Sequence, residues 1–181
     1  MFYQNFFKMI YIVLLRGVNV SGKNKIIMKD FVKILIENSK LSTIKSYIQS
    51  GNFVVKSNIN HSKELSDLFS EIILKEYQYK IKAFVYTLDE FKKIFTDYPF
   101  TPKGKVDYIT FLSKTPEQEQ VNNINKGLDT LMLKNNIIYI QYATKYSDSK
   151  LNNNYFEKQL DFSATTRNIR TISKLIEIAE K

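Results

Sequence analysis

The chain has no cysteine, no tryptophan and only one histidine, His61, among its 181 residues. The lack of cysteine excludes disulfides, thiolate zinc sites, iron–sulfur clusters and cysteine nucleophiles. One histidine cannot form a multi-histidine metal site, and a serine–histidine triad would have to use His61 itself. No segment is of low complexity, and no repeat with a period of about 20–50 residues is visible. With 44% hydrophobic and 25% charged residues, the composition is typical of a globular protein.

The formal charge is strongly positive, at +9. Lysine, isoleucine and asparagine make up about a third of the chain, a mixture typical of A- and T-rich codons, so part of the lysine surplus needs no functional explanation. The remaining surplus attracts anions. Arginine is rare by contrast, with only Arg16, Arg167 and Arg170. Because a guanidinium can bind phosphate or carboxylate through two parallel hydrogen bonds, these positions are informative about an anion site.

The N-terminal segment contains one short apolar run, residues 10–15, between Lys8 and Arg16. The run is too short for a signal-peptide core or a membrane span, and no small-residue cleavage site follows it. Six apolar residues, half of them β-branched, predict a buried strand instead. We therefore expect a cytoplasmic protein that does not associate with membranes, with residues 1–8 as an N-terminal extension.

The hydrophobic pattern along the rest of the chain predicts an α+β fold. Strand signals occur at residues 10–16, 45–50, 52–57, 82–87, 107–113 and 137–143. Apolar residues at helical spacing mark helices near 28–36 and 65–73, and two further helices at about 150–160 and 167–180 close the chain. Thr87 with Glu90, and Thr115 with Gln118, have the spacing of capping boxes.

The order of these elements through residue 87 is β-α-β-β-α-β, the ferredoxin-like arrangement, with a tight turn at residues 50–52. Residues 97–106 contain two of the three prolines and one glycine and are the most linker-like stretch. We therefore expect two small subdomains, a ferredoxin-like one at residues 9–97 and a second α+β subdomain at residues 98–181 that ends in two helices.

The first candidate for chemistry is the loop at residues 16–25, after the first strand. Its glycines permit tight turns, and its cations and amides suit an anion, phosphate above all. Gly17, Gly22 and Lys23 match most of a phosphate-binding P-loop motif, but Asn24 replaces the hydroxyl that would ligate magnesium. The strand order also differs from that of a parallel nucleotide-binding sheet. A lysine-rich surface loop and an anion-binding loop of another type both stay open.

Two further segments share this chemistry. The turn at residues 47–52 places uncharged polar side chains around one tip, although a tight turn by itself needs glycine and asparagine. The third segment combines residues 147–150 with residues 164–171. In it, Thr165 or Thr166 is predicted to cap the last helix, which places Arg167 in the first turn of that helix. A cation opposes the helix dipole there, so a bound anion or an internal carboxylate partner would explain it better than helix stability.

Taken together, these segments predict one site for a small phosphate-bearing or other anionic ligand. Arg16 and Arg167 would clamp the anion, while lysines would set the field and amides and a hydroxyl would orient the ligand. The lysines are Lys25, Lys150 and Lys174, and the orienting residues are Asn19, Gln49, Ser50, Asn52 and Asn168. Only Asp148 is acidic in the three segments, which favours binding over acid–base catalysis and indicates no metal site. Single-stranded nucleic-acid binding and a ligand-free partner or homodimer module remain alternative functions.

The same motifs carry a family resemblance. The segments at 11–25, 47–52, 149–151 and 165–168, with Met28, Thr171 and Lys174, resemble the bacterial domain of unknown function 1697. The resemblance runs from about Met9 to Ala179, and residues 1–8 lie outside it. It implies a cytosolic bacterial α+β protein with two subdomains, and it implies no established activity, cofactor or substrate.

Overall fold

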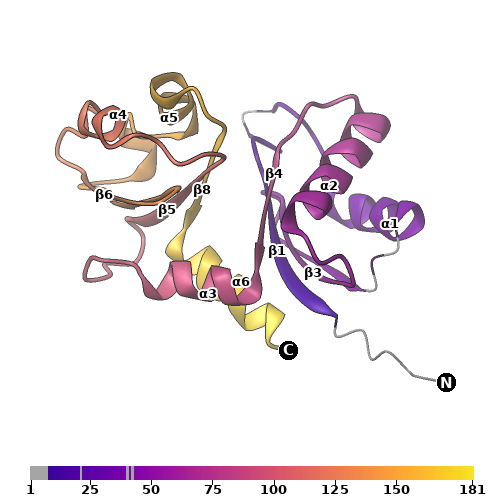
Figure 1. Ribbon diagram of the computed structural model, residues 1–181. Helices are drawn as coiled ribbons and strands as arrows, with labels where there is room; N and C mark the ends of the chain where they lie inside the picture. The colour runs from indigo at the N-terminus through magenta and orange to yellow at the C-terminus, as the bar shows by residue number, and fades with distance from the viewer. Residues whose placement is uncertain (1–7, 21, 40, 42) are drawn as a thin grey trace. The chain divides into compact units, whose positions relative to one another are not determined.

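The computed structural model describes residues 8–181 apart from 21, 40 and 42 (Figure 1). It divides into two compact units. The first holds the described residues as far as Phe91 together with Leu175–Lys181, and the second is Lys92–Lys174. The predicted α+β class with two subdomains is therefore confirmed, and each unit is described by itself below.

The first unit is a four-stranded antiparallel sheet in the order β2-β3-β1-β4. Its elements in chain order are β1 (Met9–Leu15), α1 (Met28–Asn38), β2 (Thr43–Tyr47), β3 (Asn52–Ser57), α2 (Ser62–Tyr77) and β4 (Ala83–Thr87), followed by α3 (Leu88–Thr96). The β-α-β-β-α-β order predicted from the sequence is thus observed. The central strand β1 is buried from Tyr11 to Leu15, which explains why it reads as an apolar run.

Helices α1 and α2 lie on one face of this sheet (Figure 1). Their apolar stripes and the sheet form the core of the first unit. At its centre the rings of Phe31, Phe53 and Phe69 pack edge to face, with centroids 5.6–6.0 Å apart. The three rings come from α1, β3 and α2, so they fix both helices against the sheet.

The second unit has the sheet order β6-β7-β5-β8, also fully antiparallel. Its elements are β5 (Asp107–Leu112), α4 (Gln118–Asn122), β6 (Thr130–Lys134), β7 (Ile137–Gln141), the short 3-10 helix η1 (Tyr146–Asp148), α5 (Asn153–Leu160), β8 (Ala164–Asn168) and the first residues of α6 (Ile169–Ala179). The boundaries between the units fall within two helices, after Phe91 in α3 and after Lys174 in α6. Its core is a cluster of apolar side chains centred on β5, β7 and α5.

The two units repeat one topology. Each runs β-α-β-β-α-β and ends in a helix that follows its last strand directly, and corresponding strands take the same places in the two sheets. The register agrees as well, since Leu15 pairs with Ala83 in the first unit and Leu112 pairs with Ala164 in the second. The main difference is the first crossover, which spans residues 16–27 in the first unit and only 113–117 in the second. The long loop is therefore an elaboration of the first unit.

The structure corrects the sequence reading near the C-terminus. Residues 164–168 form β8, paired with β5, and α6 begins at Ile169. The prediction that Thr165 or Thr166 caps the last helix was wrong, because these β-branched residues continue a strand that alternates between buried and half-buried positions. The cap of α6 is Asn168, whose Oδ1 accepts the backbone N–H of Arg170 at 2.9 Å.

Two other local predictions had different outcomes. The capping box of α3 is confirmed, since Glu90 Oε2 accepts the backbone N–H of Thr87 at 2.7 Å and Thr87 Oγ1 accepts that of Glu90 at 3.2 Å. The box predicted at Thr115 is wrong, because α4 begins two residues later and the reciprocal pair is Glu117 with Gln120. Strand β6 was not predicted, since its residues alternate only between exposed and half-buried at the edge of the sheet.

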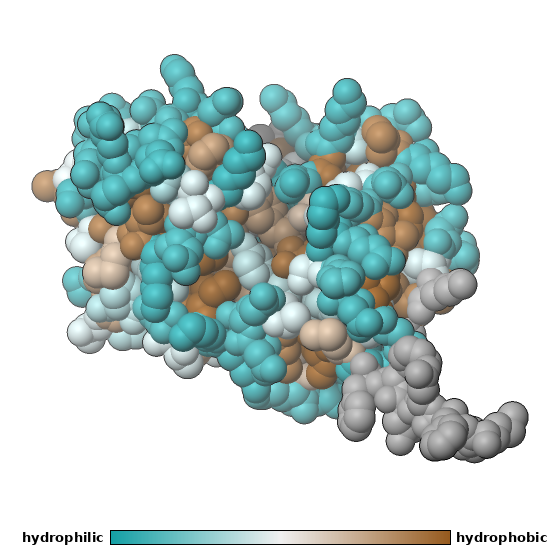
Figure 2. All heavy atoms as spheres, viewed as in Figure 1, coloured by the Kyte–Doolittle hydropathy of each residue, from teal (hydrophilic) through white to brown (hydrophobic). Residues whose placement is uncertain are grey.

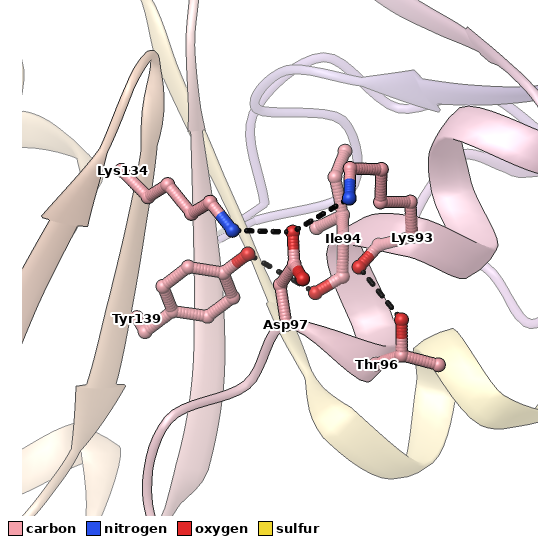
Figure 3. Close-up of polar contacts among 6 residues, drawn as sticks. All are labelled: Lys93, Ile94, Thr96, Asp97, Lys134 and Tyr139. Carbon is pink, nitrogen blue, oxygen red and sulfur yellow. Dashed lines mark hydrogen bonds and ion pairs between the residues drawn. The ribbon is translucent and has the colours of Figure 1, made fainter.

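The stretch that looked like a linker begins with an anchored residue, Asp97 (Figure 3). Lys134 Nζ lies 2.8 Å from Asp97 Oδ2 and Lys93 Nζ lies 3.8 Å from it. The hydrogen bond from Lys134 is the main cause of the lowered pKa of Asp97. Beside it, Tyr139 donates its hydroxyl to the carbonyl of Ile94 at 3.1 Å, and burial raises the pKa of Tyr139 to about 12. The last turn of α3 is thereby tied to β6 and β7.

On the surface shown in Figure 2, hydrophilic side chains predominate and apolar side chains lie between them. The most exposed large apolar residue among those described is Leu128, at 91% exposure. Scattered apolar residues of this kind are usual on globular proteins and do not by themselves indicate a partner. Over the described ranges, no helix is long and apolar enough to cross a membrane.

Candidate functional site

The predicted residues of the first loop lie in the first unit, and one of them organises the loop. Asn19 Nδ2 donates to the carbonyls of Ile26 and Gln49, at 2.8 and 2.6 Å, and its Oδ1 accepts the backbone N–H of Ile26 at 2.9 Å. Asn19 adopts a positive φ of 54°, a conformation that asparagine tolerates better than most residues. Its side chain therefore closes the loop by hydrogen bonds to Ile26 and ties it to Gln49. Lys25 is exposed and Arg16 is half-buried.

The hairpin tip is joined to the same loop. Gln49 Oε1 accepts the backbone N–H of Met28 at 3.3 Å, at the start of α1. Asn52 is fully buried, and its Nδ2 donates to the carbonyl of Tyr47 at 3.1 Å and to Ser50 Oγ at 2.9 Å. Asn19 and Gln49 thus join the loop to the hairpin, while Asn52 and Ser50 bond to each other within the hairpin.

The other predicted residues lie in the second unit. Arg167 is in β8 and is only 8% exposed; its Nη1 donates to Thr165 Oγ1 at 2.8 Å and to the carbonyl of Thr166 at 2.9 Å. Lys150 is exposed, near Asp129 and Asp148, and Lys174 is half-buried in α6. A shared cleft between these residues and the first loop stays a prediction.

The contacts of Arg167 lead to a prediction about stability. Replacing Arg167 with methionine leaves its two oxygen acceptors without these donors, so we expect the free energy of unfolding to fall by about 1–3 kcal/mol. Arg170→Ala is the matched control, because that side chain is exposed and its loss should change the free energy by no more than about 0.5 kcal/mol. Urea denaturation measures both values, and equal stabilities would contradict a structural role for Arg167.

The second unit also contains a hollow that lies within that unit alone. It has a volume of about 620 Å³ and opens beside the start of α6. We call it the cationic hollow. Its lining residues are Lys105, Val106, Tyr108, Thr144, Lys145, Tyr146, Ser147, Asn168, Arg170 and Thr171. Its volume is within the range of small-molecule pockets, about 300–1,000 Å³.

The charged side chains that line this hollow are all cations. Lys105, Lys145 and Arg170 line it, and no aspartate or glutamate does. Within the described part of the chain, none of these three cations forms an ion pair. Elsewhere in the second unit lysines do pair with carboxylates, as Lys93 and Lys134 do with Asp97. Cations that converge on one hollow without a carboxylate create a positive potential that favours an anion.

Aromatic rings form one wall of the hollow. Tyr108 and Tyr146 are stacked, with centroids 5.1 Å apart and ring planes 22° apart, and both rings are half-buried. The buried Tyr142 packs edge-on against both of them and donates its hydroxyl to the carbonyl of Leu151 at 2.6 Å. This contact holds the rings of β5 and η1 in place, so the aromatic wall is built before any ligand arrives.

A buried carboxylate supports the part of the lining at Lys105. Asp107 is fully buried and accepts hydrogen bonds from Tyr98 Oη at 2.7 Å, from Gln141 Nε2 at 2.9 Å, and from the backbone N–H groups of Lys103 and Gly104. Burial alone would raise the pKa of Asp107, but the hydrogen bonds from Gln141, Tyr98 and the backbone outweigh it and hold the pKa below its usual value. The carboxylate therefore stays charged and fixes the turn at residues 103–104.

That turn positions two functional groups of the hollow. Asn168 Nδ2 donates a hydrogen bond to the carbonyl of Lys105 at 3.3 Å. Gly104 packs against the guanidinium of Arg170, since a Cβ built on Gly104 would lie 2.7 Å from Arg170 Nη2. Asp107 therefore fixes residues 103–105 by hydrogen bonds, and these residues in turn contact Asn168 and Arg170.

Of the predicted site residues, only Asn168 lines the cationic hollow. Sequence reasoning did not assign a site role to Lys105, Lys145, Arg170, Tyr108 or Tyr146. The rarity of arginine was a usable signal for Arg170, whereas lysines and tyrosines are too frequent in this chain to stand out. No group of three or more histidine and acidic side chains among the described residues could hold a metal ion.

Comparison with known proteins places the chain in a family. It belongs to the family described as "Protein of unknown function (DUF1697)", whose model matches residues 9–139. Among solved structures, the chain is similar to the conserved bacterial protein SP0830 from Streptococcus pneumoniae, with a TM-score of 0.75 and 22% identity. That match covers 96% of this chain and 99% of the other, and at this identity it shows the fold alone. The comparison with curated proteins found no match.

Proposed function

We propose that the protein binds a small phosphate-bearing or other anionic molecule, and that the cationic hollow holds the anionic group. The observation that carries this proposal is the set of three cations around one hollow, which has no carboxylate in its lining. Arg170 offers two parallel N–H donors to a phosphate or carboxylate, and Lys105 and Lys145 add point charges. The hydroxyls of Thr144, Ser147 and Thr171 add polar groups that can orient a ligand.

The lining supports binding more than acid–base catalysis. It contains no histidine, aspartate or glutamate that could act as a general base near neutral pH. The anion also lies beside the first turn of α6, where the helix dipole favours negative charge and adds to the field of the cations. The loop and hairpin of the first unit, with Arg16 and Lys25, are a second cationic surface that we propose to contact the same class of ligand.

The experiment is a thermal-shift screen of inorganic phosphate, pyrophosphate and phosphorylated metabolites, followed by calorimetric titration of those that stabilise the protein. A ligand at about 100 times its dissociation constant stabilises the fold by about 2.7 kcal/mol. For a chain of this size we expect a rise in Tm of roughly 5–10 °C. If no anion in the screen raises the Tm, the proposal is wrong.

Variants of the hollow locate the bound anion. Arg170→Ala and Lys145→Ala should each weaken binding by about tenfold or more, since each removes a charge-assisted hydrogen bond. Lys158→Ala is the matched control: Lys158 is exposed, lies in the same unit and does not line the hollow, so affinity should hardly change. If a ligand binds equally well to Arg170→Ala, Lys145→Ala and the wild type, it binds elsewhere.

A further inference from the structure

We infer that the ligand of the cationic hollow is a nucleoside phosphate, in which the base stacks on the tyrosine wall while the phosphate meets the cations. This inference rests on the proposed function and deepens it. It starts from an arrangement that binding of a phosphate alone would not need: two stacked, half-buried tyrosines in the same hollow as three cations. Inorganic phosphate or a sugar phosphate has no planar group that could use an aromatic face.

The tyrosine wall has the properties of a stacking platform. The rings of Tyr108 and Tyr146 are nearly parallel, and Tyr142 locks them edge-on from the buried side. A preformed aromatic surface loses little conformational entropy when a base stacks on it. Every nucleobase has a π-face, so such a wall accepts purines and pyrimidines alike and discriminates against phosphates that carry no base.

The polar groups of the hollow match the rest of a nucleotide. Thr144 precedes η1 and Ser147 lies within it, so both hydroxyls are near Tyr146, where they can bond to the ribose or to the edge of the base. Ser147 Oγ also lies 3.0 Å from Asp148 Oδ1. Arg170 and Asn168 lie together at the start of α6, where the phosphate is expected. A volume of about 620 Å³ is large enough for one nucleotide.

The experiment is calorimetric titration of the full chain with AMP, UMP, ribose 5-phosphate, inorganic phosphate and adenosine at low salt and at physiological salt. Base stacking should make AMP bind about tenfold or more tightly than ribose 5-phosphate. If AMP and ribose 5-phosphate bind equally, this inference is wrong while the proposed function stands. If no phosphate binds at all, the proposed function itself is wrong.

Two variants at one position separate stacking from packing. Tyr146→Phe keeps the ring and should keep the preference for AMP over ribose 5-phosphate, whereas Tyr146→Leu keeps an apolar side chain and should reduce that preference to about threefold or less. Lys158→Ala, outside the hollow, is the control and should keep the affinities for both ligands. A preference that survives in Tyr146→Leu would place the base elsewhere and overturn the inference.

One further titration distinguishes the two sources of a nucleoside phosphate. A free mononucleotide and the phosphorylated 5′ end of a single strand present the same chemistry to the hollow. A 5′-phosphorylated oligonucleotide that binds more tightly than AMP, with a steeper dependence on salt, identifies a strand end as the source. Equal or weaker binding identifies the free nucleotide.

Discussion

The Asp107→Asn variant is expected to lose about 2–4 kcal/mol of unfolding free energy, a fall in Tm of roughly 5–15 °C. Both carboxylate oxygens of Asp107 are acceptors, and all four of their partners are donors. Asparagine has the same shape but replaces one acceptor oxygen by an NH₂ group. That NH₂ would face hydrogen-bond donors at a fully buried position. Urea denaturation at neutral pH measures the loss.

The effect should depend on pH in a direction that the pKa of Asp107 fixes. The folded pKa lies below the ordinary value, so the stability that this carboxylate contributes is fully present above the unfolded pKa of about 3.9. It is lost as the pH falls through that value towards the folded pKa. The wild type should therefore approach the variant in stability as the pH falls from about 5 to about 3. A constant difference between them over this range would contradict the role assigned to the charge.

Asp97→Asn provides the matched control for this prediction. It is the same chemical change in the same unit, but the Asp97 side chain is 24% exposed and its partners are lysines at the surface. Surface ion pairs contribute about 0–1 kcal/mol, so this variant should stay close to the wild type. The hollow provides a second readout: since Asp107 fixes the turn that carries Gly104 and Lys105, only Asp107→Asn should also weaken anion binding.

The parts of the fold that could be predicted from the sequence are those that are deeply buried. The run at residues 10–15 predicts β1 because the central strand of a covered sheet is apolar throughout. The strands β6 and β8 are harder to predict. The edge strand β6 has no buried residue, and β8 ends at Asn168 with no loop before α6, so its residues look like the start of that helix. The internal repeat was also invisible in the sequence, because strand order and register constrain burial rather than residue identity.

The proposed site keeps the chemistry that the sequence predicted but shares only Asn168 with the predicted residues. The sequence predicted an anion site rich in cations and amides, but the amides of the first loop and hairpin are used within the chain, as Asn19 and Asn52 show. A sequence does not reveal whether an amide faces a ligand or a neighbouring carbonyl. The hollow depends on the placement of η1 beside β5, which the spacing of Tyr108 and Tyr146 along the chain does not disclose.

The difference between the repeats has a structural consequence for the first unit. Its long loop at residues 16–27 needs anchors that the short crossover at 113–117 does not need. One anchor is the set of hydrogen bonds made by the Asn19 amide. The other is the close approach of Gly51 to the start of the loop, where Leu15 donates its backbone N–H to the carbonyl of Gly51 at 2.7 Å. The hairpin and the loop should therefore loosen together when this approach is blocked.

The Gly51→Ala variant tests that expectation, and we expect it to lose about 2–5 kcal/mol of unfolding free energy. Gly51 has a φ of 73°, which strains any residue with a Cβ. That Cβ would also lie 2.6 Å from Val18 Cγ2 and 2.7 Å from Leu15 Cβ. Both neighbours are only 1% exposed and belong to the packed core, so neither can move aside without disturbing it.

Gly17→Ala separates the clash from the backbone strain in this prediction. Gly17 has a similar φ of 67°, but a Cβ on it would have nothing within 4 Å. The Gly17→Ala variant should therefore lose only about 1–2 kcal/mol of unfolding free energy, which is the cost of left-handed backbone strain alone. The free energies of unfolding of the two variants, measured by thermal and urea denaturation, should differ by the cost of the clash with Val18 and Leu15. If they are equally destabilised, the close approach of the hairpin to the loop does not hold this part of the first unit together.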